Sequence, residues 1–173
     1  MRARWWGRAI GPAIVTLLIA GSTASAAEAG IAALARWELV GRTSDGSVAL
    51  RVPVPDGRFT LEYRNSLYGS PAAEHFVVAD DGRLSLVGLG ATDAAILQEY
   101  YAVSEAPRRA VAGAWAGWWQ VPAATPVELS SLTVAASSHG ERTLVLASGA
   151  RIRLWEMVVP GDLRITLRAR PGG

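Results

Sequence analysis

The chain has 173 residues, no cysteine, and 17 basic residues, all of them arginine, against 15 acidic residues. Since no disulfide can form, a hydrophobic core must hold the fold together. Residues 1–26 contain three arginines and no acid, so the remaining 147 residues carry a formal charge of −1 instead of the +2 of the whole chain. A near-neutral chain of this kind argues against a nucleic-acid partner.

The first 26 residues have the pattern of a secretory signal peptide. A basic start is followed by an apolar run over residues 9–20 and by the small-residue triplet Ala24-Ser25-Ala26. This order is typical of a cleaved export signal, so we expect a protein that begins near Ala27 and works in the periplasm or outside the cell. The alternative is an uncleaved anchor, which would need about 18 to 20 apolar residues to cross a bilayer. With the signal removed, we expect no membrane span.

After an Ala-rich lead at 27–35, the pattern predicts one domain over residues 36–170. Apolar and polar residues alternate along 59–64 and again along 163–168, as in strands that bury one face and expose the other. Turn signals such as Asp45-Gly46 and Asp80-Asp81-Gly82 separate these runs at the spacing of a sandwich or barrel. The predicted fold class is therefore all-β, an antiparallel β-sandwich of about nine short strands. The expected strands are residues 36–42, 47–54, 58–65, 74–79, 83–88, 127–136, 141–147, 150–158 and 162–169.

One short helix is predicted at residues 92–101. Thr92 is placed to cap its start. Helical periodicity would bury one side of it, which consists of Ile96, Leu97, Tyr100 and Tyr101.

Residues 102–126 fit no predicted strand and form a long loop with three tryptophans, Trp115, Trp118 and Trp119. A loop of this length in a small domain is usually a lid, a binding loop or a misread element. The tryptophans are either a stacking platform for sugars or an anchor for another protein, or they fold back as a plug over an open end of the sandwich.

The segment from Asn65 to Glu74 contains a cluster of polar residues, with Ser66 and Tyr68 between them. Short polar side chains often satisfy backbone amides in turns, and Glu74 could accept from these amides or from Tyr68. The alternative is contact with a ligand or partner.

A Ser66, His75 and Asp80 or Asp93 triad is a weak hypothesis. Phe76 and Val78 are expected to face the core, so His75 points to the outside as an ordinary surface residue, and Ser66 lacks a nucleophile-elbow sequence. Two isolated histidines without cysteine also argue against zinc, and the acidic turn at 80–82 is too short for calcium. We therefore predict no catalytic residue, no metal and no cofactor.

The last two strands predict an arginine-lined face. If Pro160-Gly161 is the tip of a hairpin, Arg153 faces Arg168 and Arg151 faces Arg170, while Leu154 meets Leu167, and Val158 meets Leu163, on the core side. Like charges opposite each other are unfavourable unless an anion or a carboxylate lies between them. The face would suit a carboxylate, a phosphate headgroup or an acidic partner surface. The alternative is a set of splayed, solvated arginines with Trp155 packed among them.

About two thirds of the chain resembles a family of small exported bacterial domains of unknown function. The matching blocks are residues 59–90, 97–102, 128–157 and 161–167. Genes of that family often lie beside those of tripartite ATP-independent periplasmic (TRAP) transporters. The family signature is a His-Ser-Val strand end, a proline and a glutamate; the matching residues are Asn65, Ser66 and Leu67, then Pro71 and Glu74. Asparagine in place of histidine removes a titratable ring, so a proton-transfer role is not expected at that position.

We therefore expect a non-enzymatic, exported accessory or interaction module. The resemblance implies contact with the solute-binding protein or the membrane subunits of a TRAP-type uptake system. The alternative is a cell-envelope module that binds carbohydrate or a small anion. The candidate contact residues are Asn65, Ser66, Tyr68, Glu74, Trp115, Trp118, Trp119, Arg151, Arg153 and Arg168.

Overall fold

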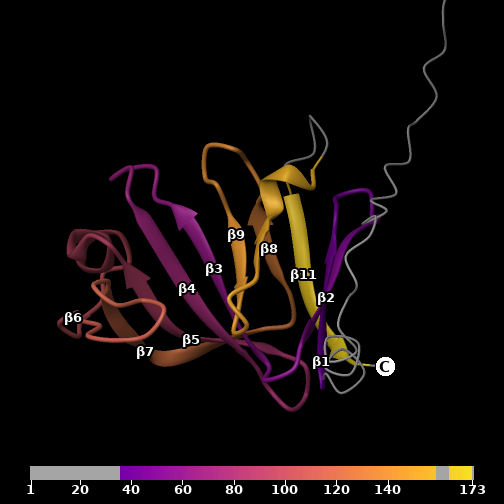
Figure 1. The fold of residues 1–173 in the computed structure, drawn as a ribbon, viewed down its shortest axis with the longest axis horizontal. Helices are drawn as coiled ribbons and strands as arrows, with labels where there is room; N and C mark the ends of the chain where they lie inside the picture. The colour runs from indigo at the N-terminus through magenta and orange to yellow at the C-terminus, as the bar shows by residue number, and fades with distance from the viewer. Residues whose placement is uncertain (1–35, 159–163, 173) are drawn as a thin grey trace, which may run out of the picture.

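The computed structural model describes residues 36–158 and 164–172, which form two antiparallel sheets (Figure 1). One sheet has the order β2 (Val48–Val54), β1 (Trp37–Arg42), β11 (Arg164–Pro171) and β8 (Leu132–Ala135). The other has the order β10 (Arg151–Arg153), β9 (Thr143–Leu146), β3 (Arg58–Arg64), β4 (Pro71–Val78), β5 (Leu84–Ala91), β7 (Trp119–Leu129) and β6 (Arg108–Arg109). The prediction of an all-β sandwich is confirmed. The predicted signal peptide at 1–26 and the lead at 27–35 lie outside the described residues.

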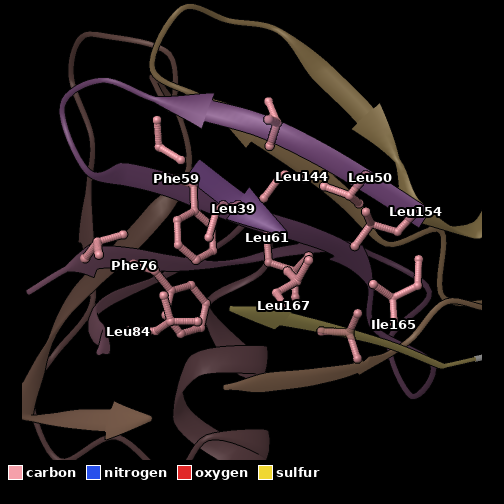
Figure 2. Close-up of a cluster of buried hydrophobic side chains, with 14 of the residues drawn as sticks. Leu39, Leu50, Phe59, Leu61, Phe76, Leu84, Leu144, Leu154, Ile165 and Leu167 are labelled. Carbon is pink, nitrogen blue, oxygen red and sulfur yellow. The ribbon is translucent and has the colours of Figure 1, made fainter. Parts of the chain in front are cut away.

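Alternate side chains of both sheets build the main core between them (Figure 2). The four-stranded sheet contributes Leu39, Leu50, Ile165 and Leu167, and the seven-stranded sheet contributes Phe59, Leu61, Phe76, Leu84 and Leu144. Each side chain of this size contributes about 1.5 to 3 kcal/mol by leaving water, which makes this core the main source of stability. Because the inner faces are used for packing, the polar side chains of both sheets lie mainly on their outer faces.

A second cluster covers the inner face of the seven-stranded sheet beyond the main core. It is closed by η1 (Ile96–Tyr100), a single π-helical turn with Ile96 and Leu97 fully buried. This element is shorter than the predicted helix at 92–101, and the side chain of Tyr100 is 54% exposed instead of buried. The predicted cap was also wrong, because the Asp93 carboxylate accepts from the Ala95 amide (3.0 Å) while the Thr92 hydroxyl donates to the Pro71 carbonyl (3.3 Å).

The predicted turn between residues 79 and 83 is confirmed and shows why its sequence is needed. Gly82 has φ = +83°, a conformation that residues with a Cβ rarely adopt. The Asp81 carboxylate accepts a hydrogen bond from the Arg83 amide (2.9 Å). The turn thereby joins β4 to β5 as adjacent antiparallel strands.

The predicted long loop and the strand expected after it are wrong in their boundaries. The loop at 102–126 contains β6 and the first part of β7, and the expected strand at 127–136 is instead the end of β7 followed by β8 in the other sheet. β7 escaped the pattern because it contains Pro122 and Pro126, and proline cannot donate to a ladder. A register shift in β5 between Leu86 and Gly88 accommodates this irregular partner.

The strand predicted at 150–158 ends at Arg153. It is followed by η2 (Leu154–Glu156), a 3₁₀ turn that places Leu154 in the main core. Among the residues that the structure describes, no helix is both long and apolar enough to cross a membrane.

Candidate ligand-binding site

The outer face of the seven-stranded sheet carries a hollow of about 570 Å³ at the edge formed by β3, β9 and β10. Strand pairing places Thr143 beside both Glu62 and Arg153, so these three side chains lie on one face. We call this site the arginine hollow. It is lined by Glu62, Tyr63, Arg64, Gly69, Pro71, Glu141, Thr143, Arg151, Arg153 and Trp155.

Each guanidinium of the arginine hollow has an acidic neighbour. Arg151 makes a two-pronged ion pair with Glu62, in which Nη1 donates to Oε1 at 3.1 Å and Nη2 donates to Oε2. This pairing raises the pKa of Arg151 above its usual value. The Arg64 guanidinium lies 3.8 Å from the Glu141 carboxylate. Such exposed pairs contribute little stability, but they hold the guanidinium groups in place.

Arg153 and Trp155 form the far wall of the arginine hollow. The guanidinium of Arg153 lies 5.9 Å from the centre of the Trp155 ring and donates to the Glu156 carboxylate at 3.0 Å. An aromatic surface beside charged donors suits a ligand with both an apolar face and an acidic group. Two of the predicted contact residues, Arg151 and Arg153, therefore lie in one hollow.

The predicted arginine hairpin was wrong. β10 pairs with β9 in the seven-stranded sheet, whereas β11 pairs with β1 and β8 in the four-stranded sheet. Arg168 therefore lies on a different sheet from Arg153, and the two expected like-charge pairs do not form. The cause is the 3₁₀ turn η2, which ends β10 before the chain reaches β11.

Of the two predicted pairs on the core side of that hairpin, only Leu154 and Leu167 can be compared with the structure. Leu154 and Leu167 are buried in the same core, although they are not partners in a ladder. The expected tip Pro160-Gly161 and the partner Leu163 lie outside the described residues.

A second feature of the same outer face is the tryptophan strap, which we define as residues 110–118 between β6 and β7. It is closed by backbone hydrogen bonds from the Ala110 amide to the Trp118 carbonyl (2.9 Å) and from the Gly117 amide to the Ala110 carbonyl (2.8 Å). Trp115 and Trp118 pack edge to face at 4.9 Å. The strap thus folds back onto the sheet, as one of the two alternatives predicted, but it covers a sheet face instead of an open end.

The strap covers His75, which the sequence analysis placed on the surface. The His75 ring does face away from the core, as predicted, but it packs edge to face against Trp115 at 5.2 Å. Its Nδ1 is 2.9 Å from the Thr60 hydroxyl, and its Nε2 is buried without a hydrogen-bond partner. Burial lowers the pKa of His75, and the negative charge of Glu62 opposes this shift more weakly.

Trp119 does not belong to the strap surface. It lies on β7, packs on the second cluster and is covered by the Arg109 guanidinium at 5.2 Å from its ring centre. The three tryptophans that the sequence groups together therefore have two different environments.

The hypothetical serine triad has no support in the contacts. Ser66 is exposed in the turn between β3 and β4. His75 has Thr60 as its neighbour, while Asp80 pairs with Arg36 at 2.8 Å. In the described ranges, no three histidine, cysteine or acidic side chains come together as metal ligands.

The polar cluster after β3 locks its own turn. The Asn65 side chain is only 2% exposed, and its Oδ1 accepts from the amides of Leu67 (3.0 Å) and Tyr68 (3.2 Å). The Tyr68 hydroxyl donates to the Glu99 carboxylate at 2.6 Å. The expected contact of Glu74 with Tyr68 or the turn amides is therefore wrong.

Glu74 instead belongs to an internal network on the inner face of the sheet. Its carboxylate accepts from the Tyr101 hydroxyl at 2.7 Å, and Tyr101 is hydrogen-bonded to Tyr63. Burial raises the pKa of Tyr63 to about 12, and it also raises that of Tyr101. Both hydroxyls stay neutral, which suits a structural role.

The lining residues Glu62, Arg64, Glu141 and Thr143 were not among the predicted contact residues, and Trp155 was expected only to pack among the arginines. Glu62 and Arg64 occupy the polar positions of the alternating run at 58–65, which was the available signal. Their convergence with Thr143 depends on the pairing of β3 with β9, which no local pattern encodes.

The site therefore belongs to an all-β sandwich with a charged hollow on one outer sheet face. Comparison with known proteins found no matching family model, no similar curated protein and no similar solved structure.

Proposed function

We propose that this protein is an exported, non-enzymatic binding module and that its arginine hollow binds a small hydroxylated carboxylate, such as an acidic sugar. The observation that carries the proposal is the convergence of Arg64, Arg151 and Arg153 on one hollow of about 570 Å³. This volume lies within the range of about 300 to 1,000 Å³ that is usual for small-molecule sites.

The lining groups match that ligand class. A guanidinium can donate two parallel hydrogen bonds to a carboxylate. Glu62, Glu141 and Thr143 offer oxygen acceptors for ligand hydroxyls, and Trp155 offers a flat apolar surface for a sugar ring. The mixture of charges favours a polar ligand with one acidic group over an apolar one.

A non-catalytic role is supported by the state of the groups that could do chemistry. The His75 ring packs against Trp115 of the tryptophan strap, its Nε2 is buried, and its Nδ1 is hydrogen-bonded to Thr60. The buried tyrosines have raised pKa values, which makes them poor bases or nucleophiles at neutral pH.

The experiment is a calorimetric titration with glucuronate, galacturonate and gluconate, with glucose as the neutral match for glucuronate. We expect saturable binding of at least one acid and weaker binding of glucose. Arg153→Gln should raise Kd about 10- to 100-fold, because it removes a charge-assisted hydrogen bond worth about 1.5 to 3 kcal/mol. Arg168→Gln is the matched control, since it removes the same charge from the other sheet.

The proposal fails if none of the three acids binds. It also fails if Arg153→Gln and Arg168→Gln weaken binding equally.

An accessory role in a TRAP-type uptake system is the second candidate, and an exposed apolar tip favours it. Leu67 is 75% exposed in the turn after β3, and Tyr100 is 54% exposed on η1. The Tyr68 to Glu99 hydrogen bond ties the turn to η1. This tip includes Ser66 and Leu67, which belong to the segment that carries the family resemblance, and an apolar tip suits a protein partner.

Crosslinking in the native host tests this role. We expect recovery of a solute-binding or membrane subunit with the parent chain and its loss with Leu67→Asp. Recovery of no transporter component with the parent chain would count against the accessory role.

A further inference from the structure

The outer face of the four-stranded sheet is strongly basic. Alternation along β1, β2 and β11 places five arginines on it, against one acid, Glu38. Strand register brings Arg170 opposite Glu38, Arg168 opposite Val40, and Arg51 on the other side of Val40. We call this surface the arginine face. It consists of Arg42, Arg51, Arg164, Arg168 and Arg170.

The arginine face differs from the arginine hollow in its charge balance. In the hollow, Glu62 and Glu141 lie beside the arginines. On the arginine face the one ion pair of Glu38 within the described part of the chain is with Arg51, at 2.7 Å. Arg168 and Arg170 have no side-chain hydrogen bond or ion pair within residues 36–158 and 164–172. Arg168 and Arg170 therefore offer guanidinium donors that no side chain of the described residues engages.

Arg168 and Arg51 lie on either side of Val40 in the sheet. Val40 lies on this outer face, yet only 2% of it is exposed. Neighbouring strands are about 4.8 Å apart, so guanidiniums on three adjacent strands span a broad and open surface on the order of 10 Å wide. A broad basic surface suits a repeated array of anions better than one small ligand.

Within the arginine face lies a hollow of about 280 Å³. Its walls include Arg42, Arg168 and Arg170, with the hydroxyl-bearing residues Thr43 and Thr166, and none of the described wall residues is acidic. Arg42 is held in position because its Nη1 donates to the Gly46 carbonyl at 2.6 Å. Three guanidiniums around one hollow match the oxygens of a phosphate group.

We propose that the arginine face docks the exported protein on the surface of an anionic phospholipid bilayer, with one headgroup phosphate seated between Arg42, Arg168 and Arg170. The attraction is electrostatic and peripheral. This interaction goes beyond the proposed function, because it uses the other sheet and leaves the arginine hollow available for its ligand.

The test is co-sedimentation of the chain from Ala27 onward with vesicles of phosphatidylglycerol and phosphatidylcholine, compared with vesicles of phosphatidylcholine alone. We expect binding to the anionic vesicles only, with a decrease as salt is added. Each arginine near an anionic surface adds roughly fivefold to partitioning. The triple variant Arg42→Gln, Arg168→Gln, Arg170→Gln should therefore bind on the order of 100-fold more weakly.

The matched control is the triple variant Arg58→Gln, Arg64→Gln, Arg153→Gln, which removes the same charge from the other sheet. We expect this control variant to retain most of the binding to anionic vesicles. Glu38→Gln removes the one acid of the arginine face and should strengthen binding, which provides a test that does not depend on loss of function. Circular dichroism and urea midpoints establish that each variant is folded.

Three results would overturn the proposal. One is equal binding to neutral and anionic vesicles, and another is an equal loss in the two triple variants. The third is binding to a soluble anionic polymer such as heparin without binding to the vesicles. The triple variant of the arginine face should still bind glucuronate. Loss of vesicle binding with retained glucuronate binding would show that the two proposed sites are independent.

Discussion

Replacement of His75 by glutamine should change how stability depends on pH. The His75 ring lies between Thr60 and Trp115, and its Nε2 is buried without a partner. Protonation would place a positive charge at this enclosed nitrogen. The folded state therefore prefers the neutral ring, which is why burial lowers the pKa of His75 below 6.5.

The sign follows from proton linkage. Between the lowered folded pKa and the value of 6.5 for an unperturbed histidine, the unfolded chain binds more protons than the folded chain. The free energy of unfolding must then rise with pH across this window. The contribution of His75 is fully present above about pH 6.5 and is lost as the pH falls through the folded pKa. One proton limits the slope to about 1.4 kcal/mol per pH unit.

Urea unfolding followed by tryptophan fluorescence measures this slope between about pH 5.5 and pH 7.5. We expect His75→Gln to flatten the pH dependence of the unfolding free energy in this window. His139→Gln is the control, because His139 is exposed in the turn before β9. An unchanged slope in His75→Gln, or the same flattening in His139→Gln, would refute the idea that the strap encloses a neutral histidine.

Three further predictions concern stability, each measured as a shift of the urea midpoint. Leu61→Ala should cost about 3 to 4 kcal/mol, since Leu61 is 1% exposed at the centre of the core and its loss leaves a cavity; a cost below about 1 kcal/mol would contradict the core assignment. Asn65→Ala should cost about 1 to 2 kcal/mol because two turn amides lose their acceptor, whereas exposed Ser66→Ala should have no effect. Tyr101→Phe should cost about 1 to 3 kcal/mol by breaking the hydrogen bonds to Glu74 and Tyr63, and a neutral result would show that this network is not structural.

Local patterns predicted the positions of many strands along the chain. The alternation at 58–65 predicts β3 almost to the residue, and the turn at 80–82 predicts the β4–β5 connection, because side-chain period and glycine conformation are local properties. The first part of β7 was missed because proline is unusual inside strands, whereas here pairing with β5 and β6 holds the segment in the sheet. The helix was overextended because only one turn of it, at Ile96 and Leu97, finds a core to cover.

For the candidate sites, too, some properties follow from local sequence and others do not. The sequence by itself determined that Arg151, Arg153, Arg168 and Arg170 occupy polar positions of their strands, since alternation decides which side chains share a face. Only the tertiary structure decided that Arg153 lies in a hollow with Glu62 while Arg168 lies on the opposite sheet. The choice of strand partners depends on packing between residues that are far apart in the chain. The short 3₁₀ turn at Leu154 ends β10, so that β10 and β11 belong to different sheets although they are consecutive in the chain.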